Sequence, residues 1–206
     1  MEYGGVCRDI EAMVARCARD HILIVEDAAH SMFAGVRGRP YGTFASVGAF
    51  SFHNTKNVSC GEGGAVVLRD RDLYERALVL REKGTDRARF LRGEVDKYTW
   101  RDLGSSWLPS DLLAAVLVAQ LEHADVLQAQ RQAAWRAYHD ALAPEASRRG
   151  FRLQSIPAGV EHPAHLFGVV LAATEQRARV IKSLAELPHD VLVEKLLNAS
   201  KSSFFC

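Results

Sequence analysis

Two short apolar runs that end near reactive polar side chains constrain the fold of this chain most. The first, His21 to Val25, is followed within two residues by Asp27. The second, Val47 to Phe52, precedes Lys56 and a glycine-rich turn, Gly61 to Gly64. Compact aliphatic runs of this length are typical of strands covered on both faces of a largely parallel sheet. Because ligands collect outside the carboxyl ends of such strands, we expect the side chains that follow both runs to share one crevice.

Segments with helical periodicity alternate with these runs. Asp9 to Arg19 predicts a short helix with one buried face, and Asp70 begins a predicted helix after a further strand, Ala65 to Leu68. Ser110 precedes the longest periodic segment, which we expect to continue to about Leu142. Alternation of strands and helices places the chain in the α/β class.

The chain is predicted to divide at a proline into two units. Residues 1–143 form the larger unit, which ends with the long helix, and residues 144–206 form a smaller α+β unit. The smaller unit contains predicted strands at Phe151 to Gln154 and His165 to Leu171, and a predicted helix from Glu175 towards Leu187.

Two segments have no sustained period. Thr85 to Arg101 holds eight charged residues, which favours an exposed loop that could border a site. Asn198 to Ser203 is rich in small polar residues and is expected to form a loose tail.

The composition excludes several classes of partner. With 26 Lys and Arg against 25 Asp and Glu, a net charge of +1 gives no general electrostatic reason to bind nucleic acid or an anionic membrane. The chain has no signal-peptide pattern at its start and no apolar stretch long enough to span a bilayer, so the cytosol is the expected compartment. Its cysteines are scattered, show no metal-ligand spacing and are expected to be free thiols: Cys7, Cys17, Cys60 and Cys206.

Lys56 can act as a nucleophile only if its amine is neutral. An exposed lysine has a pKa near 10.4, so deprotonating it at pH 7 costs roughly 4 to 5 kcal/mol. Only the neutral amine attacks a carbonyl and can form an imine with an aldehyde cofactor. Burial beside Phe50 and Phe52, or positive charge from His53, would lower the pKa of Lys56. The alternative is a solvated surface lysine, which describes most lysines.

Three further side chains have both a chemical and an ordinary interpretation. Asp27 could keep the ring nitrogen of pyridoxal phosphate protonated, which strengthens the ring as an electron sink, or it could cap the following turn. His30 could hydrogen-bond the ring hydroxyl, or it could be a polar turn residue. Ser51 could donate to the phosphate, or it could only bond the strand end. The glycines after Lys56 permit close approach, but such turns are common.

Three strings occur in order along the chain: Val25-Glu26-Asp27-Ala28-Ala29-His30, Phe50-Ser51-Phe52-His53-Asn54-Thr55-Lys56-Asn57 and Gly61-Glu62-Gly63-Gly64. Together they resemble the motifs of the DegT/DnrJ/EryC1/StrS sugar aminotransferases. Residues 81–87, 95–106 and 110–115 narrow the resemblance to the branch that aminates a thymidine-diphosphate 4-keto-6-deoxyhexose in enterobacterial common antigen synthesis. The resemblance extends from about Tyr3 to Ala185.

This resemblance implies a fold-type-I enzyme that uses pyridoxal 5′-phosphate and moves an amino group from glutamate to the 4-keto carbon of the sugar nucleotide. By motif position, Lys56 resembles the Schiff-base lysine and Asp27 the partner of the pyridine nitrogen. His30 resembles the contact to the cofactor hydroxyl, and Ser51 a phosphate ligand. The family implies a homodimer with sites at the subunit interface and a role in cell-surface polysaccharide synthesis. No metal is implied.

The same resemblance predicts a chain truncated at both ends. Relatives carry a preceding segment, and where they continue with a His-Tyr-x-Pro-Leu-His string this chain reads Pro188 to Val193. Two alternatives therefore stay open. One is a non-catalytic fragment that dimerises with a full-length relative, and the other is a different pyridoxal phosphate enzyme of the same fold that modifies sugars. A dehydratase branch carries histidine at the position of Lys56, so the lysine favours amino transfer.

Overall fold

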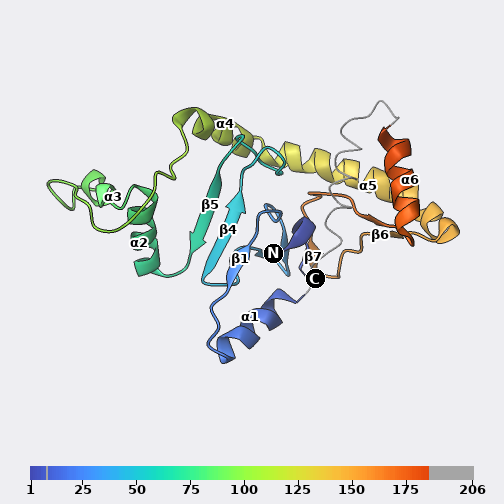
Figure 1. Cartoon of the computed structure of the whole chain (residues 1–206), viewed down its shortest axis with the longest axis horizontal. Coiled ribbons are helices and arrows are strands. Elements are labelled where there is room, and N and C mark those ends of the chain that lie inside the picture. Colours follow the sequence, from blue (N-terminus) through green and yellow to red (C-terminus); the bar gives the residue numbers. More distant parts are fainter. Residues whose placement is uncertain (8, 186–206) are drawn as a thin grey trace.

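A three-stranded sheet lies at the centre of the computed structural model, which describes residues 1–7 and 9–185 (Figure 1). Its strands, in the order β1-β4-β5, are β1 (Val25–Asp27), β4 (Val47–Ser51) and β5 (Gly64–Leu68). β1 and β4 are parallel, with Asp27 opposite Ala49, whereas β4 and β5 are antiparallel. The predicted α/β class is confirmed, although this sheet is mixed rather than mainly parallel.

β1 lies further along the chain than the predicted strand, His21 to Val25. The prediction that this run is covered on both faces is wrong, because Leu23 is 90% exposed and Val25 is 64% exposed. Within the described residues β1 pairs only with β4, so it forms an edge of the sheet. An aliphatic run indicates a strand but does not show which neighbours cover it.

Two predicted helices form as expected. α1 (Ile10–Arg19) follows Asp9, although the Asp9 side chain makes no capping hydrogen bond. α2 (Arg71–Arg81) follows Asp70, whose carboxylate accepts a hydrogen bond from the backbone N–H of Leu73 at 2.8 Å. This contact satisfies one of the N–H groups that a helix leaves without an internal partner.

The charged segment Thr85 to Arg101 is more ordered than the predicted exposed loop. It contains a short helix, α3 (Arg87–Leu91), and its first residues are buried. The Asp86 carboxylate accepts hydrogen bonds from the backbone N–H of Thr99 at 2.7 Å and from the Arg101 side chain at 2.6 Å. These contacts hold the pKa of Asp86 below its usual value and close the segment on itself.

The predicted long helix is two helices, α4 (Asp111–Glu122) and α5 (Ala124–Arg149), which meet at His123 with a bend of 67°. α5 continues through Pro144, so the predicted helix end near Leu142 is wrong. Proline removes one backbone donor, but here only one further turn follows it. The division into residues 1–143 and 144–206 stays a prediction. Among the described residues, no single helix is long and apolar enough to cross a membrane, although the bent α4–α5 pair passes that test by length and composition.

Smaller elements complete the described chain. A second sheet, in the order β3-β2-β7, contains β2 (Gly35–Val36), β3 (Arg39–Pro40) and β7 (Val160–Glu161). The sequence did not predict its hairpin, in which Arg37 and Gly38 both take positive φ, as in tight hairpin turns. The last elements are β6 (Arg152–Leu153), β8 (Val169–Val170), which pairs with it, and α6 (Thr174–Ala185). The predicted tail and the altered string from Pro188 lie outside the described residues.

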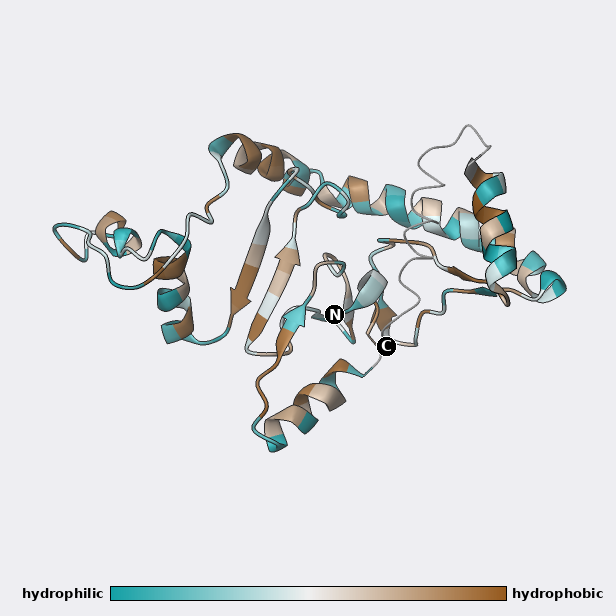
Figure 2. Cartoon of the chain, in the orientation of Figure 1, coloured by the Kyte–Doolittle hydropathy of each residue, from teal (hydrophilic) through white to brown (hydrophobic). Residues whose placement is uncertain are grey.

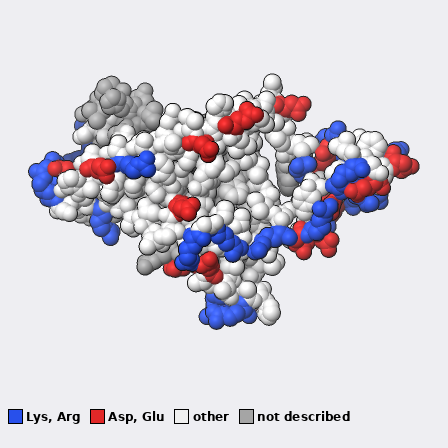
Figure 3. Space-filling model, turned by 180° about the vertical axis from the view of Figure 1, so that it is seen from behind, with Lys and Arg blue, Asp and Glu red and all other residues white. Residues whose placement is uncertain are grey.

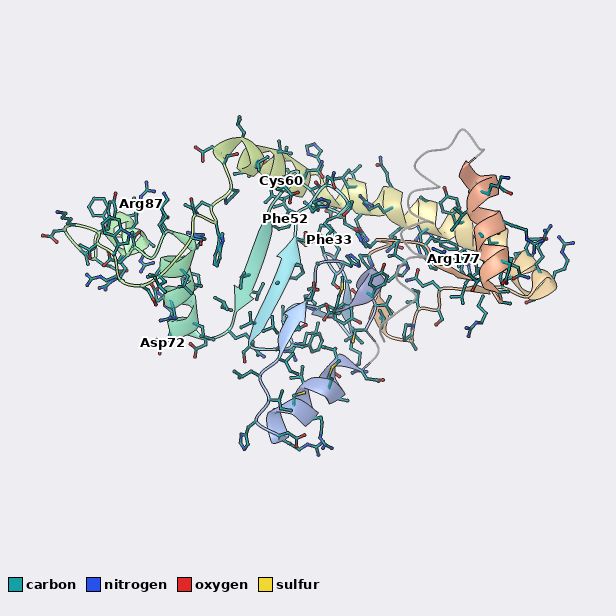
Figure 4. The ribbon with its side chains drawn as sticks, in the orientation of Figure 1. Phe33, Phe52, Cys60, Asp72, Arg87 and Arg177 are labelled. Carbon is teal, nitrogen blue, oxygen red and sulfur yellow. The ribbon has the colours of Figure 1, made fainter. Side chains whose placement is uncertain are left out.

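Two apolar clusters hold the fold together. The first joins α1 to the β2–β3 hairpin and contains Ile10, Ala34, Val36, Tyr41 and Phe44. The second contains Phe52, Val58 and Cys60, and it packs against Leu113 and Leu117 of α4. Figure 4 shows Phe52 and Cys60 beneath the helices that cross the upper end of the sheet. The second cluster therefore ties the segment around Lys56 to α4.

α4 exposes much of its apolar surface (Figure 2). None of its residues is buried, and Leu112 is 80% exposed. Figure 3 shows that the middle of the opposite side of the molecule is mostly uncharged, with a few scattered acidic groups, and that most lysine and arginine side chains lie below it or at the two ends. A helix that is apolar on most sides is usually enclosed by other elements or by a partner.

Candidate active site

Lys56 lies in the connection between β4 and β5, which backbone hydrogen bonds hold in a narrow hairpin. The N–H of Phe52 donates to the carbonyl of Gly63 at 2.8 Å, and the N–H of Cys60 donates to the carbonyl of Phe52 at 3.0 Å. Within this connection, the N–H of Lys56 donates to the carbonyl of His53 at 2.9 Å. We call residues 52–63 the lysine loop. Three apolar side chains of the lysine loop, Phe52, Val58 and Cys60, form the second cluster and hold the loop in place.

The glycine-rich turn serves first to close this hairpin. Gly61 takes a φ of +92°, which a residue with a side chain rarely adopts. A Cβ atom on Gly64 would lie 2.8 Å from the carbonyl oxygen of Phe50, on the neighbouring strand. Both glycines are therefore required by the strand pairing beside Lys56.

The environment of Lys56 lowers the pKa of its amine below that of a solvated lysine. The side chain is half-buried, and burial lowers the pKa of its amine, while the charge of Asp27 acts in the opposite direction. No positive charge of His53 acts on this amine. The His53 ring bonds the Thr55 hydroxyl at 3.0 Å and lies 3.6 Å from the Glu62 carboxylate. Burial is thus the cause of the lowered pKa.

Asp27 and its neighbour Glu26 occupy opposite faces of β1, as strand alternation requires. Glu26 is buried, and its carboxylate accepts hydrogen bonds from the backbone N–H groups of Gly42, at 2.7 Å, and Ala45. Asp27 is exposed, and its Oδ1 accepts from the N–H of Ala29 at 3.1 Å. The turn-capping interpretation of Asp27 is therefore realised. Its charge also acts on Lys56 and on His30, so the three side chains lie within electrostatic range of one another.

His30 is held as a neutral hydrogen-bond donor. Burial first, and then the charge of Lys56, lower the pKa of His30 to about 4, against the opposing charge of Asp27. Its Nδ1 accepts a hydrogen bond from the backbone N–H of Gly4 at 3.3 Å. The neutral ring must then carry its proton on Nε2. Tyr3 contacts the ring edge-on at 5.0 Å between centroids, which fixes the ring orientation.

Ser51 ends β4, and its hydroxyl oxygen accepts a hydrogen bond from the N–H of His53 at 3.3 Å. This contact is the strand-end role considered as the alternative. A hydroxyl that accepts one hydrogen bond can still donate its own proton to an anion. The phosphate role of Ser51 stays a prediction.

Sequence reasoning missed a set of side chains behind Lys56. Asn57, which follows the lysine, is 4% exposed, and its amide contacts three distant residues: Gln128, Pro163 and His165. Arg131 of α5 donates to the carbonyl oxygen of Lys56 at 3.2 Å. The only local signal was the position of Asn57 next to a candidate nucleophile, because its partners lie more than 70 residues away along the chain.

The side chains near Lys56 fit an aldehyde cofactor that carries a ring nitrogen and a phosphate. They include an amine with a lowered pKa, an exposed carboxylate, a neutral imidazole donor and a hydroxyl. The described residues contain no group of three or more His, Cys, Asp or Glu side chains that could hold a metal ion. The arrangement therefore suits amine and proton-transfer chemistry.

Comparison with known proteins identifies the family. Residues 1–193 match the model of the DegT/DnrJ/EryC1/StrS aminotransferase family. The chain belongs to this family. The match extends past Leu187, where the resemblance was expected to fade.

Several curated proteins are similar to this chain. L-glutamine:scyllo-inosose aminotransferase of Streptomyces griseus is 36% identical over 164 residues, which are 76% of this chain and 37% of the relative. GDP-perosamine synthase of Escherichia coli O157:H7 is 33% identical over 124 residues, which are 60% of this chain and 32% of the relative. The chain thus spans about a third of the length of these curated relatives.

Several solved structures have the same fold over most of this chain. The aminotransferase TlmJ from Streptoalloteichus hindustanus has a TM-score of 0.79 at 25% identity, covering 90% of this chain and 48% of that protein. DesV of S. venezuelae has a TM-score of 0.72 at 33% identity, covering 87% of this chain and 46% of that protein. The pyridoxal phosphate form of the sugar aminotransferase Spr1654 from Streptococcus pneumoniae has a TM-score of 0.74 at 22% identity, covering 90% of this chain and 50% of that protein. The fold-type-I assignment is confirmed over the part of the fold that the chain spans.

Proposed function

We propose that this chain carries the catalytic lysine of a sugar aminotransferase that uses pyridoxal 5′-phosphate. The observation that supports this most is the cluster of Lys56, Asp27 and His30, in which the charge of Asp27 acts on both other side chains and the charge of Lys56 acts on His30. Membership of an aminotransferase family supports the same function.

Each residue of the cluster has a distinct role. When bound, pyridoxal phosphate supplies an aldehyde and an electron-withdrawing ring. Asp27 holds a proton on the ring nitrogen, and His30 donates its Nε2 proton to the ring oxygen. Ser51 and nearby backbone N–H groups bind the phosphate. Lys56 would hold the cofactor through its Nζ and, as a neutral amine, would take up and return a proton at that atom.

The proposed substrates are glutamate, as the amino donor, and a dTDP-4-keto-6-deoxyhexose, as the acceptor. The residues that resemble the enterobacterial common antigen branch support this choice, and a role in cell-surface polysaccharide or lipopolysaccharide synthesis follows from it. The names of the curated relatives include scyllo-inosose and GDP-perosamine, so the family accepts more than one sugar-like ring. Incubation of the complete protein with glutamate or glutamine and each keto sugar, followed by detection of the amino sugar, tests the choice.

We also propose that the protein is a cytosolic homodimer. The exposed apolar surface of α4 supports association with a second copy. The same observation favours a second candidate function, a non-catalytic chain that dimerises with a longer relative. Binding of the cofactor to Lys56 separates these two candidates.

Titration with pyridoxal phosphate tests the proposed function directly. We expect a visible absorption band on addition of the cofactor, and reduction with borohydride followed by peptide mass spectrometry should place the label on Lys56. The variant Lys56→Ala should lose both signals, while Lys97→Ala, which removes an exposed lysine, should keep them. Labelling spread over surface lysines, with an unchanged signal in Lys56→Ala, would contradict the proposal.

A further inference from the structure

The amide of Asn57 joins the lysine loop to two other parts of the chain. Its Nδ2 donates to the carbonyl oxygen of Pro163 at 2.7 Å and to Oε1 of Gln128, on α5, at 3.3 Å. Its Oδ1 lies 2.7 Å from Nδ1 of His165, which is itself only 8% exposed. All three contacts are buried or partly buried, and each joins residues more than 70 positions apart.

These contacts fix the hydrogen positions of the pair. The carbonyl oxygen of Pro163 can only accept, so the NH₂ group of Asn57 must face it. The amide oxygen of Asn57 must then face His165, and this oxygen can also only accept. Nδ1 of His165 therefore carries a proton and donates it to Asn57. An exchange of His165 for a residue without a donor at this position leaves the buried amide oxygen without this partner.

α5 presents one face to the same region. Gln128, Arg131 and Gln132 lie at helical spacing, so their side chains point the same way. Gln128 bonds Asn57, Arg131 donates to the carbonyl oxygen of Lys56 at 3.2 Å, and Gln132 donates to the carbonyl oxygen of His162 at 2.5 Å. Both the lysine loop and the segment His162 to Phe167 are thus attached to this helix.

His165 also contacts the other side of the site. Its ring lies 4.3 Å from the ring of His30, measured between centroids, at an interplanar angle of 30°. Through Asn57 it is linked to the backbone of Lys56, and through its ring it packs on His30. The buried side chain of His165 therefore contacts both Asn57 and His30. It comes from a segment that the sequence assigns to the smaller unit.

We propose that His165 is a positioning residue, which acts through Asn57 to hold Lys56 and through ring packing to hold His30. The inference rests on the proposed function, since it assigns a role within the same site. It implies that the segment His162 to Phe167 completes the site and is not merely attached to it. A substitution at His165 should therefore alter the environment of the Lys56 amine, although the lysine itself is unchanged.

Competitive labelling of lysines with acetic anhydride, over a range of pH, measures this environment without any cofactor. The yield at Lys56, read by peptide mass spectrometry, gives the pH at which its amine becomes neutral. The charge that acts on this amine is that of Asp27 of β1, the charge of the amine acts in turn on His30, and Arg131 approaches the lysine backbone from α5. The same measurement on His165→Phe, His165→Asn and His139→Phe separates the hydrogen bond to Asn57 from the ring contact with His30.

The three variants differ in what they keep. His165→Phe keeps a ring beside His30 but loses the donor, whereas His165→Asn keeps a donor near the position of Nδ1. His139→Phe is the matched control, because His139 is a partly exposed ring of α5 that stacks on Trp135 at 5.2 Å. We expect His165→Phe to raise the labelling midpoint of Lys56 by about one pH unit, towards the value of a solvated lysine. We expect His165→Asn and His139→Phe to keep the midpoint of the unchanged protein.

Each other outcome overturns the inference. An unchanged midpoint in His165→Phe shows that the hydrogen bond to Asn57 does not hold the lysine. If the labelling midpoint shifts as much in His165→Asn as in His165→Phe, the cause is a general loss of packing. If it shifts as much in His139→Phe, the effect is not specific to His165. Circular dichroism melting of each variant identifies a shift caused by unfolding, which also counts against positioning. The cofactor titration of Lys56 stands apart, since a visible band with an unchanged labelling midpoint would leave the proposed function intact.

Discussion

At the scale of single residues, His30 offers a test of the electrostatics because its pKa is lowered to about 4. Unfolding would return this pKa to about 6.5, so the unfolded chain binds a proton between these values that the folded chain does not. Stability is therefore unaffected by His30 above pH 6.5 and is lost as the pH falls from 6.5 towards 4. We expect this group to remove about 2 kcal/mol of the unfolding free energy between pH 7.5 and pH 5.

Urea unfolding at both pH values measures this effect. The variant His30→Gln should have a weaker pH dependence by about the same 2 kcal/mol, because glutamine does not titrate. His139→Gln replaces a partly exposed histidine and should leave the pH dependence unchanged. Equal pH dependence in His30→Gln and the unchanged chain would show that His30 titrates normally in the folded state.

Asp27 acts on Lys56 in the direction opposite to burial. We expect Asp27→Asn to lower the labelling midpoint of Lys56, since the carboxylate no longer stabilises the ammonium form. The same variant should weaken binding of pyridoxal phosphate, because the amide cannot hold a proton on the ring nitrogen as a carboxylate does. Asp72→Asn, on the exposed first turn of α2, is the matched control (Figure 4). A midpoint that rises in Asp27→Asn would contradict the assignment.

Only the site residues that lie in or beside short recognisable sequence strings could be predicted. Asp27, His30 and Lys56 each follow an apolar run, and parallel pairing of β1 with β4 brings the ends of these runs together. Asn57 and His165 could not be predicted, since their contact joins positions 108 residues apart and depends on how the later segment crosses the lysine loop. Periodicity describes neighbours along one element and not the packing between elements.

At the scale of elements, the lysine loop depends on its apolar anchors. Val58 is 1% exposed within the cluster that packs against α4. We expect Val58→Ala to reduce the unfolding free energy by about 2 kcal/mol, from lost burial and a small cavity. Val66→Ala is the matched control on β5, where the side chain is 62% exposed, and should cost much less. Urea unfolding compares the two, and equal losses would show that the cluster does not anchor the loop.

The presence and the first residues of the helices were predicted better than the bend between α4 and α5 and the end of α5. Asp70 and Ser110 both precede helices as the capping preference indicates, and each accepts a hydrogen bond from a first-turn N–H. The bend at His123 has no sequence signal, because the apolar spacing continues from α4 towards α5. Pro144 was expected to end a helix, but it lies within the last two turns of α5, where the loss of one backbone hydrogen bond is tolerated.

At the scale of the whole molecule, the described fold leaves apolar surface that a partner would cover. Leu112 and Val116 of α4 are exposed, as are Leu23 and Val25 beside the edge of the sheet. The chain spans about a third of the length of these curated relatives. Association with another chain would restore the burial.

The proposed homodimer can be tested at this surface. We expect the chain at tens of micromolar to sediment as a dimer or larger species, and Leu112→Asp to shift it towards the monomer, because a carboxylate on α4 would have to be desolvated in the interface. Leu91→Asp changes an equally accessible leucine on α3 and should leave the distribution unaltered. Analytical ultracentrifugation measures both variants. A chain that is monomeric at this concentration, or a Leu91→Asp variant that dissociates as readily as Leu112→Asp, would remove α4 as the site of self-association, and the partner of this helix would then be sought among longer members of the family.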